Sequence, residues 1–220
     1  MTSGTTPLGL GVLASGRGSN LQAILEACAR PGFPARVVAV VSDRERAQAL
    51  DRARATGVPA RFVNPKDFPD REAYDLALVR ELQARGVGLV CLAGFMRILT
   101  SGFVRAYAGR ILNVHPSLLP AFPGLAAQRQ ALEYGVKVAG ATVHFVDEGV
   151  DTGPVVLQSS VPVHPDDTEE SLSARILAEE HRLYPDAIRL FAEGKLVIAG
   201  RRVVVRAAGR PGAAASEASL

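Results

Sequence analysis

The chain has 220 residues, of which 48% are hydrophobic and 21% charged, and this suits one globular domain, alone or with a small appendage. A formal net charge of only +3, 5% aromatic residues and no tryptophan argue against a protein that stacks nucleic-acid bases. The chain shows no apolar stretch near the roughly 18 residues of a membrane span, no signal-peptide pattern and no Cys/His cluster with metal spacing, so we expect a cytoplasmic protein without membrane, nucleic-acid or metal partners.

Apolar stretches alternate with helical patterns along the first half of the chain. The predicted elements, in order, are a strand at Leu8–Ala14, a helix at Ser19–Ala29, a strand at Arg36–Ser42, a helix at Arg44–Thr56, a strand at Ala60–Val63, a helix at Arg71–Arg85, a strand at Gly88–Ala93, a helix at Gly102–Tyr107 and a strand at Ile111–Val114. The run Val37–Val41 is apolar at every position, as a strand buried on both faces must be. This order predicts an α/β fold with a doubly wound, mostly parallel sheet.

After residue 120 the pattern changes. A short helix near Ala126–Tyr134 precedes longer strands at Ala141–Val146 and Val155–Val163, which we expect to extend the sheet with partly antiparallel pairing. Asp167 and Thr168 supply the N-cap of a long helix that reaches about Ala192 and is kinked or split at Pro185. The remaining predictions are a terminal hairpin over Lys195–Ala207, one domain over residues 1–208 and a disordered tail over residues 209–220.

The loop after the first strand, Ser15–Asn20, reads SGRGSN. Glycines between a strand and a helix let backbone N–H groups approach a phosphate at the positive end of the helix. The loop is not a dinucleotide fingerprint, because Leu21 stands where the last glycine is required, and it lacks the Gly-Lys-Ser/Thr of a P-loop. We interpret it as a site for a phosphate monoester, and the structural alternative is a tight turn capped by Ser19.

The most informative segment is Asn113–Pro120, which reads NVHPSLLP. Residues two apart in a strand point to the same side, so Asn113 and His115 should project into one space before Pro116 leaves the sheet. An amide N–H can stabilise an oxyanion and an imidazole can move a proton near neutral pH, which together suit acyl transfer. The alternative is a strand end with a surface histidine.

Two other segments are candidates for the same site. Asp151 lies in the glycine-punctuated loop Asp147–Pro154, where its carboxylate, placed beside His115, would orient the ring and favour the protonated form of a general acid. A solvated acidic turn is the alternative. Phe95–Leu99 surrounds an arginine with apolar residues, which indicates either a slot for a flat heterocycle or core packing. His144 falls in mid-strand and is interpreted as packed or paired.

Together the segments SGRGSN (15–20), AGFMRIL (93–99), NVHPSLLP (113–120) and VDTGP (150–154) resemble the phosphoribosylglycinamide formyltransferases, folate-dependent enzymes of purine synthesis. The resemblance covers about residues 8–205. It implies a Rossmann-like formyltransferase fold and transfer of the formyl group of 10-formyltetrahydrofolate to the glycyl amine of glycinamide ribonucleotide. The products would be formylglycinamide ribonucleotide and tetrahydrofolate, no metal would take part, and the enzyme would be a monomer or homodimer.

The resemblance also implies roles for individual residues. The half at about 8–110 would bind the ribonucleotide phosphate, and the half at about 111–208 would carry catalytic and folate elements. The catalytic set would be Asn113, His115 and Asp151; the ribonucleotide would contact Gly18, Ser19, Asn20 and Glu180; the folate would contact Arg71, Met96, Arg97, Ile98, Leu99 and Asn113. The chain departs from the family pattern in lacking a histidine within Ala126–Gln128 and in having Leu177 where some members are polar, which bears on secondary substrate contacts.

Three rival functions stay open from the sequence. Methionyl-tRNA formyltransferase shares the Asn-x-His segment but normally adds a C-terminal RNA-binding domain. Formyltetrahydrofolate hydrolase usually carries an N-terminal regulatory domain, and we expect neither domain in this chain. A catalytically idle phosphate-binding module on the same sheet is the more distant alternative.

Overall fold

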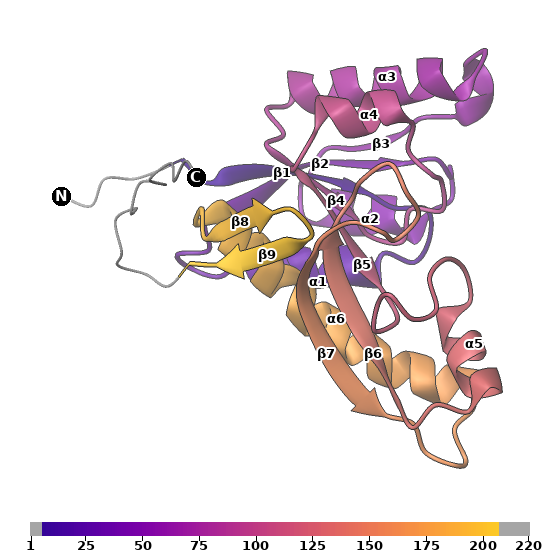
Figure 1. Cartoon of the computed structure of the whole chain (residues 1–220). Coiled ribbons are helices and arrows are strands. Elements are labelled where there is room, and N and C mark those ends of the chain that lie inside the picture. Colours follow the sequence, from indigo (N-terminus) through magenta and orange to yellow (C-terminus); the bar gives the residue numbers. More distant parts are fainter. Residues whose placement is uncertain (1–5, 207–220) are drawn as a thin grey trace, which may run out of the picture.

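A computed structural model describes residues 6–206, so the tail predicted to be disordered, 209–220, lies outside the described residues. Its strands form one sheet in the order β3-β2-β1-β4-β5-β6-β7-β9-β8 (Figure 1). The strands are β1 Leu8–Leu13, β2 Ala35–Ser42, β3 Ala60–Phe62, β4 Leu89–Leu92, β5 Ile111–His115, β6 Val138–Phe145, β7 Val155–Pro162, β8 Leu196–Ala199 and β9 Arg202–Val205. The helices are α1 Ser19–Cys28, α2 Gln48–Ala55, α3 Arg71–Ala84, α4 Ser101–Ala106, α5 Ala127–Tyr134 and α6 Glu169–Ala192.

The sheet has a parallel part and an antiparallel part, as predicted. Strands β1 to β5 pair in parallel with their neighbours. From β5 onward, β6 and β7 pair antiparallel with their neighbours. The β8–β9 hairpin extends the sheet through a parallel contact of β9 with β7, and β8 is the edge strand. The strand order reverses between β1 and β4, which is the point where open α/β sheets generally bind ligands.

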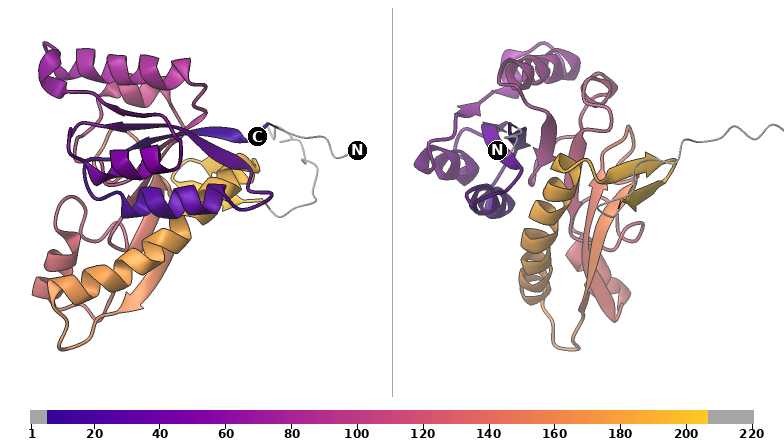
Figure 2. Two further views of the ribbon diagram at one scale, coloured as in Figure 1. Left: turned by 180° about the vertical axis from the view of Figure 1, so that it is seen from behind. Right: turned by 90° about the vertical axis from the view of Figure 1, so that its left-hand side faces the viewer.

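Two hydrophobic cores lie on opposite faces of the sheet. Helices α1, α2 and α6 pack on one face, and α3 and α4 pack on the other (Figure 2). Strand β1 contributes to both because its side chains alternate: Leu10 and Val12 belong to the first core and Leu13 to the second. A Cβ atom at Gly11 would lie 2.7 Å from the Leu82 side chain, so the glycine lets α3 pack close to the central strand.

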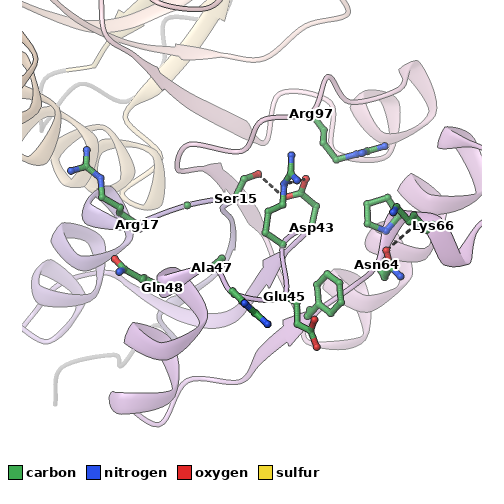
Figure 3. A pocket seen from close by; sticks show the side chains of 14 residues that line it. Ser15, Arg17, Asp43, Glu45, Ala47, Gln48, Asn64, Lys66 and Arg97 are labelled. Carbon is green, nitrogen blue, oxygen red and sulfur yellow. Dashed lines mark hydrogen bonds and ion pairs between the residues drawn. The ribbon is translucent and has the colours of Figure 1, made fainter. Parts of the chain in front are cut away.

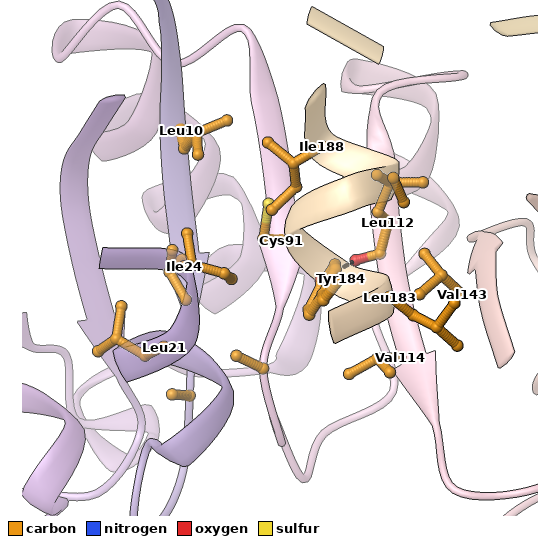
Figure 4. Close-up of a cluster of buried hydrophobic side chains, with 14 of the residues drawn as sticks. Leu10, Leu21, Ile24, Cys91, Leu112, Val114, Val143, Leu183, Tyr184 and Ile188 are labelled. Carbon is orange, nitrogen blue, oxygen red and sulfur yellow. Dashed lines mark hydrogen bonds between the residues drawn. The ribbon is translucent and has the colours of Figure 1, made fainter. Parts of the chain in front are cut away.

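Helix α6 begins as predicted but continues through Pro185. Its N-terminus has a capping box between Thr168 and Ser171. The Tyr184 hydroxyl lies 3.0 Å from the Leu92 carbonyl oxygen and 2.8 Å from that of Leu112, on two neighbouring strands (Figure 4). The prediction of a split helix is wrong, because α6 runs unbroken through Pro185. Buried side chains on both sides of the proline, among them Tyr184 and Ile188, pack the helix against the sheet and offset the roughly 3 kcal/mol that an internal proline costs.

Helix α2 starts at Gln48, four residues later than predicted. The Arg44 N–H donates to Ser42 Oγ at 3.0 Å, and the Ala47 N–H donates to the Arg44 carbonyl at 3.2 Å. These bonds form a turn that competes with the helix, as serine side chains often do. The residues between β2 and α2 therefore form a loop at the carboxyl edge of the sheet.

Candidate active site

The three residues predicted to be catalytic lie together at the end of β5. Asn113 Nδ2 is 3.5 Å from Asp151 Oδ1, and His115 Nδ1 is 3.4 Å from Asp151 Oδ2. His115 is only 5% exposed, so the alternative of a surface histidine is wrong. The same-side placement of Asn113 and His115 follows from the alternation of a strand, and it brings an amide and an imidazole to one carboxylate.

Both ring nitrogens of His115 face oxygen acceptors. Nε2 lies 2.9 Å from the Phe122 carbonyl oxygen, which can only accept, so Nε2 carries a hydrogen. Nδ1 faces the Asp151 carboxylate at 3.4 Å. The ring can therefore donate from Nε2 to the Phe122 carbonyl while the Asp151 carboxylate orients it through Nδ1.

Asp151 is held in an unusual backbone conformation by its surroundings. Its φ is +53°, a left-handed value that is uncommon outside glycine, and its Oδ2 accepts from the Gly124 N–H at 2.8 Å. Burial raises the pKa of the Asp151 carboxyl, but bonds from His144 and Gly124 and the charge of His115 outweigh it, so that pKa lies below its ordinary value. Asp151 is therefore an ionised partner for His115 at neutral pH.

The loop that carries Asp151 is fastened at both ends. The Thr152 hydroxyl donates to Asp147 Oδ1 at 2.6 Å, and Arg201, from the turn between β8 and β9, donates to the Thr152 carbonyl at 3.1 Å. Arg105 also contacts Glu148 at 3.3 Å. These contacts support the left-handed residue between them.

His144 is a site residue whose part sequence reasoning missed. It is paired and 2% exposed, as expected, but it is also the direct cross-strand neighbour of Asn113. Its Nδ1 faces the Phe145 carbonyl at 2.9 Å, and its Nε2 lies 3.2 Å from Asn113 Nδ2 and 3.5 Å from Asp151 Oδ1. The signal that could have found it is the antiparallel register of β5 and β6, which places residues 113 and 144 opposite each other.

A buried hydroxyl holds the segment that follows His115. Thr142, opposite His115 on β6, donates to the Ser117 carbonyl at 2.6 Å and accepts from the Leu119 N–H at 3.1 Å. Gln158 donates to the Leu119 carbonyl at 2.8 Å. The chain beyond Pro116 is thereby positioned against β6 and β7.

The glycine loop leads into an uncapped helix. Gly18 is the N-cap of α1, with a φ of +71°, and a Cβ atom there would lie 2.8 Å from Ala49 Cα, so only glycine fits. No side chain caps α1, and the alternative of a turn capped by Ser19 is wrong. The N–H groups of the first turn lack a side-chain acceptor at the positive end of the helix, which is the arrangement that binds phosphate.

Asn20 and Glu180, both predicted to contact the ribonucleotide, form a buried pair. Asn20 Nδ2 donates to Glu180 Oε2 at 2.7 Å. Asn20 Oδ1 is buried and has no hydrogen-bond partner among residues 6–206. Burial raises the pKa of the Glu180 carboxyl to about 7, against the opposing effect of the Asn20 bond. The pair thus offers an unfilled acceptor and a carboxyl that titrates near neutrality.

Glu180 should make stability fall as pH rises. The pKa of the Glu180 carboxyl is about 7 in the folded protein and 4.5 in the unfolded chain. The protonated carboxyl therefore contributes its full stabilising free energy below pH 4.5, and this contribution is lost as pH rises to 7. We expect the free energy of unfolding of the wild type, relative to Glu180→Gln, to decrease by about 3 kcal/mol over that interval. Urea unfolding of both proteins at several pH values between 4 and 8.5 measures this, and parallel stability curves would contradict it.

The segment predicted to contact the folate is held by two hydrogen bonds. The Met96 N–H donates to Ser15 Oγ at 2.9 Å, and Arg71 donates to the Ile98 carbonyl at 2.7 Å. Met96 and Ile98 are 62% and 61% exposed, whereas Leu99 is buried in the core beneath them. The segment presents two apolar side chains outward and anchors itself with a third; core packing holds for Leu99, and the slot for a flat heterocycle stays a prediction.

Arg97 belongs to this segment, and Arg71 contacts it from α3. The Arg97 guanidinium stacks 5.0 Å from the centroid of the Tyr74 ring of α3, and Arg71 is the first residue of the same helix.

Over the described part of the chain, no cluster of three or more His, Cys, Asp or Glu residues could hold a metal ion. Over the same residues, no helix has both the length and the apolarity to cross a membrane.

Comparisons with known proteins show the family to which the chain belongs. Residues 10–188 match the model of the formyl transferase family. The phosphoribosylglycinamide formyltransferase of Escherichia coli is 49% identical over 185 residues, which cover 84% of this chain and 87% of that protein. The crystal structure of glycinamide ribonucleotide transformylase 1 from Symbiobacterium toebii superposes with a TM-score of 0.91 at 59% identity, covering 93% of this chain and 97% of that one.

A longer relative matches only in part. The trifunctional purine biosynthetic protein adenosine-3 of Drosophila melanogaster is 50% identical over 189 residues, which are 85% of this chain. The matched region is only 14% of that protein, so the chain spans a small part of the length of such multifunctional relatives.

Proposed function

The chain belongs to the formyl transferase family, and we propose that it transfers the formyl group of 10-formyltetrahydrofolate to the glycyl amine of glycinamide ribonucleotide. The product would be formylglycinamide ribonucleotide, formed in purine synthesis. The observation that carries the proposal is the convergence of Asn113 and His115 on the Asp151 carboxylate, with both contacts within 3.5 Å. The partners that this reaction requires are the two small-molecule substrates.

Asn113 and His115 would stabilise the charge that develops during transfer. Attack of the amine nitrogen on the formyl carbon forms a C–N bond and places negative charge on the formyl oxygen. Asn113 Nδ2 lies 3.2 Å from His144 Nε2 and 3.5 Å from Asp151 Oδ1. The Nδ2 hydrogen that faces Asp151 is in the longer contact, and this hydrogen would bond to the oxyanion. A protonated His115 would add positive charge beside it, and the His115 side chain is buried, which strengthens such an interaction.

His115 would also move the proton. The attacking amine must lose a proton, and the departing N10 of the folate must gain one when its bond to the formyl carbon breaks. The hydrogen on His115 Nε2, which bonds to the Phe122 carbonyl in the structure, is the one available for exchange. Asp151 keeps the ring oriented through Nδ1. No covalent intermediate is needed, since Ser117 lies beyond Pro116 and bonds to the Ala121 carbonyl.

The ribonucleotide would extend from α1 towards α6. The N–H groups of the first turn of α1, with the Ser19 hydroxyl, suit the phosphate. The Asn20–Glu180 pair, with its unfilled acceptor, suits the hydroxyl groups of the ribose. The folate would lie at the other side of Asn113, where Met96 and Ile98 offer apolar surface and Arg71 a positive charge for the glutamate carboxylate.

Ser19→Ala should act on ribonucleotide binding alone. Losing one hydrogen bond to a charged group costs about 1.5–3 kcal/mol, so we expect the KM for glycinamide ribonucleotide to rise about 10-fold or more at nearly constant kcat. Steady-state kinetics with each substrate varied in turn measures this. Ser160→Ala, an exposed serine on β7, is the control. A rise confined to the KM of the folate would contradict the phosphate assignment.

The proposed reaction is tested by supplying both substrates to the purified chain. We expect tetrahydrofolate and formylglycinamide ribonucleotide to appear in equal amounts, and only when the amine is present. Release of formate without the amine would indicate a hydrolase instead. Tight binding of the ribonucleotide without any turnover would indicate an idle binding module.

A further inference from the structure

A cavity outside the catalytic residues lies at the carboxyl ends of β1, β2 and β3, and it has a volume of about 910 Å³ (Figure 3). Loop residues after each of these strands line it, together with Arg97 from the loop after β4. None of the residues proposed to hold the ribonucleotide or to act in catalysis lines it. The cavity therefore borders the segment proposed for the folate through Arg97 but lies apart from the catalytic and ribonucleotide residues, and it has the size that small-molecule ligands occupy in proteins.

The cavity contains a buried carboxylate whose bonding is incomplete. The Asp43 side chain is only 3% exposed, and its Oδ1 accepts from the Ser15 hydroxyl at 2.6 Å. Among the residues described, Oδ2 contacts only Arg44 Nε, at 3.7 Å, and the Arg44 side chain is 69% exposed. Ser15 occupies Oδ1, whereas Oδ2 keeps its acceptor capacity, so Oδ2 is suited to receive hydrogens from a ligand.

The position of this carboxylate in the fold indicates the kind of donor. Asp43 directly follows β2 and stands 25 residues after Gly18 in the loop that follows β1. In doubly wound sheets an acidic residue about 20 residues beyond the glycine loop accepts hydrogen bonds from the hydroxyls of a ribose. The switch in strand order between β1 and β4 lies beside it.

The other lining residues supply charge and an aromatic surface. Five cations line the cavity, against the carboxylates of Asp43 and Glu45; they are Arg17, Arg44, Arg46, Lys66 and Arg97. This surplus favours a phosphorylated ligand. On the β3 side, Phe62 adds an aromatic ring that suits a heterocyclic base, whereas the Asn64 amide is bonded to the Lys66 N–H and to Asp67.

We propose that this cavity binds a ribonucleoside phosphate as a second ligand. The 2′- and 3′-hydroxyls donate to Asp43, the phosphate lies among the arginines and the base packs against Phe62. The Ser15 hydroxyl links the two sites, because it donates to Asp43 and accepts from the Met96 N–H of the segment proposed for the folate. Binding in the cavity therefore alters the KM for 10-formyltetrahydrofolate.

Calorimetric titration of the full chain with ADP, 2′,3′-dideoxy-ADP and pyrophosphate tests the class of ligand. We expect ADP to bind at least about 10-fold more tightly than the other two, since each of them lacks one set of hydrogen bonds to a charged group. Equal affinity for ADP and pyrophosphate would show an anion site without ribose recognition and would overturn the proposal. So would equal affinity for ADP and its dideoxy analogue, or no binding of ADP.

Variants place the ligand in the cavity. Asp43→Asn keeps an acceptor for Ser15 but presents an amide to the hydroxyls, and we expect it to weaken ADP binding about 10-fold or more without changing thermal unfolding. Lys66→Ala should weaken binding of both ADP and pyrophosphate, and Arg30→Ala, exposed beyond α1, should change neither. Wild-type ADP affinity in both cavity variants would overturn the proposal.

Competition separates the two sites. Saturating glycinamide ribonucleotide should leave ADP affinity within about 3-fold of its value alone, because coupling energies between sites are commonly modest. Full displacement of ADP would put it in the substrate site and overturn the proposal. Turnover measured on the same preparation reports independently on the proposed formyl transfer, so either idea can fail alone.

Discussion

His115→Ala is expected to lower kcat for formyl transfer by about 100-fold or more. General acid–base catalysis contributes roughly 10²–10⁴-fold, and this variant removes both the proton on Nε2 and the positive charge next to the Asn113 amide. The KM values for both substrates should change little, because the phosphate and folate ends bind elsewhere. Steady-state kinetics under saturating concentrations of both substrates gives the ratio.

The matched control is His164→Ala. The His164 side chain is exposed in the turn before α6, far along the chain from β5, and we expect wild-type turnover. His115 is buried, so its removal also leaves a cavity, and thermal unfolding should confirm that both variants remain folded at the assay temperature. Near wild-type kcat in a folded His115→Ala protein would mean that the proton moves by another route.

The parts of the site that lie within one segment could be predicted from the sequence. Asn113 and His115 share a strand end, so the period of the strand alone places them on one side. Gly18 stands where a strand passes into a helix, and the structure assigns it a left-handed φ that glycine accommodates. In each case the determining physics is local.

The parts that depend on tertiary structure could not be worked out in this way. His144 acquires its position from the antiparallel register of β5 and β6, which the long connection through α5 separates in sequence. Glu180 reaches Asn20 only because α6 crosses the sheet to lie against α1. Glu180 was predicted as a ribonucleotide contact only through the resemblance to a family. His144 was given no role in the site, because a histidine in the middle of a strand is ordinarily a packed side chain.

Helix boundaries show the same division. The start of α2 depends on whether residues 44–47 form a turn or the first turn of the helix. The Arg44 N–H donates to Ser42 Oγ, which favours the turn, so α2 starts at Gln48. The continuity of α6 through Pro185 depends on the packing of Tyr184 and Ile188 against the sheet. The first outcome moved residues 44–47, which directly follow Asp43, from a helix into a loop, and these residues line the cavity at the ends of β1, β2 and β3.

Asp151→Asn is expected to lower kcat by about 100-fold or more, with little change in fold. The amide retains an oxygen that can accept from the Gly124 N–H, so the left-handed turn keeps a support. It loses the negative charge that faces His115 Nδ1 at 3.4 Å, so a protonated His115 would lack the carboxylate that stabilises its charge. The loss therefore falls on protonated His115 and not on substrate binding.

The pH dependence distinguishes this role from a merely structural one. The pKa of Asp151 lies below its ordinary 3.8, so its charge stabilises the wild type above that value, and this contribution is lost as pH falls through the lowered pKa. The variant has no charge at residue 151 to lose, so we expect its kcat to lack the fall at low pH that protonation of Asp151 causes in the wild type. Asp166→Asn, an exposed aspartate in the turn before α6, should leave the pH–kcat profile unchanged. An Asp151→Asn profile that keeps the wild-type shape at reduced height would show that the carboxylate acts only as a structural support for its loop.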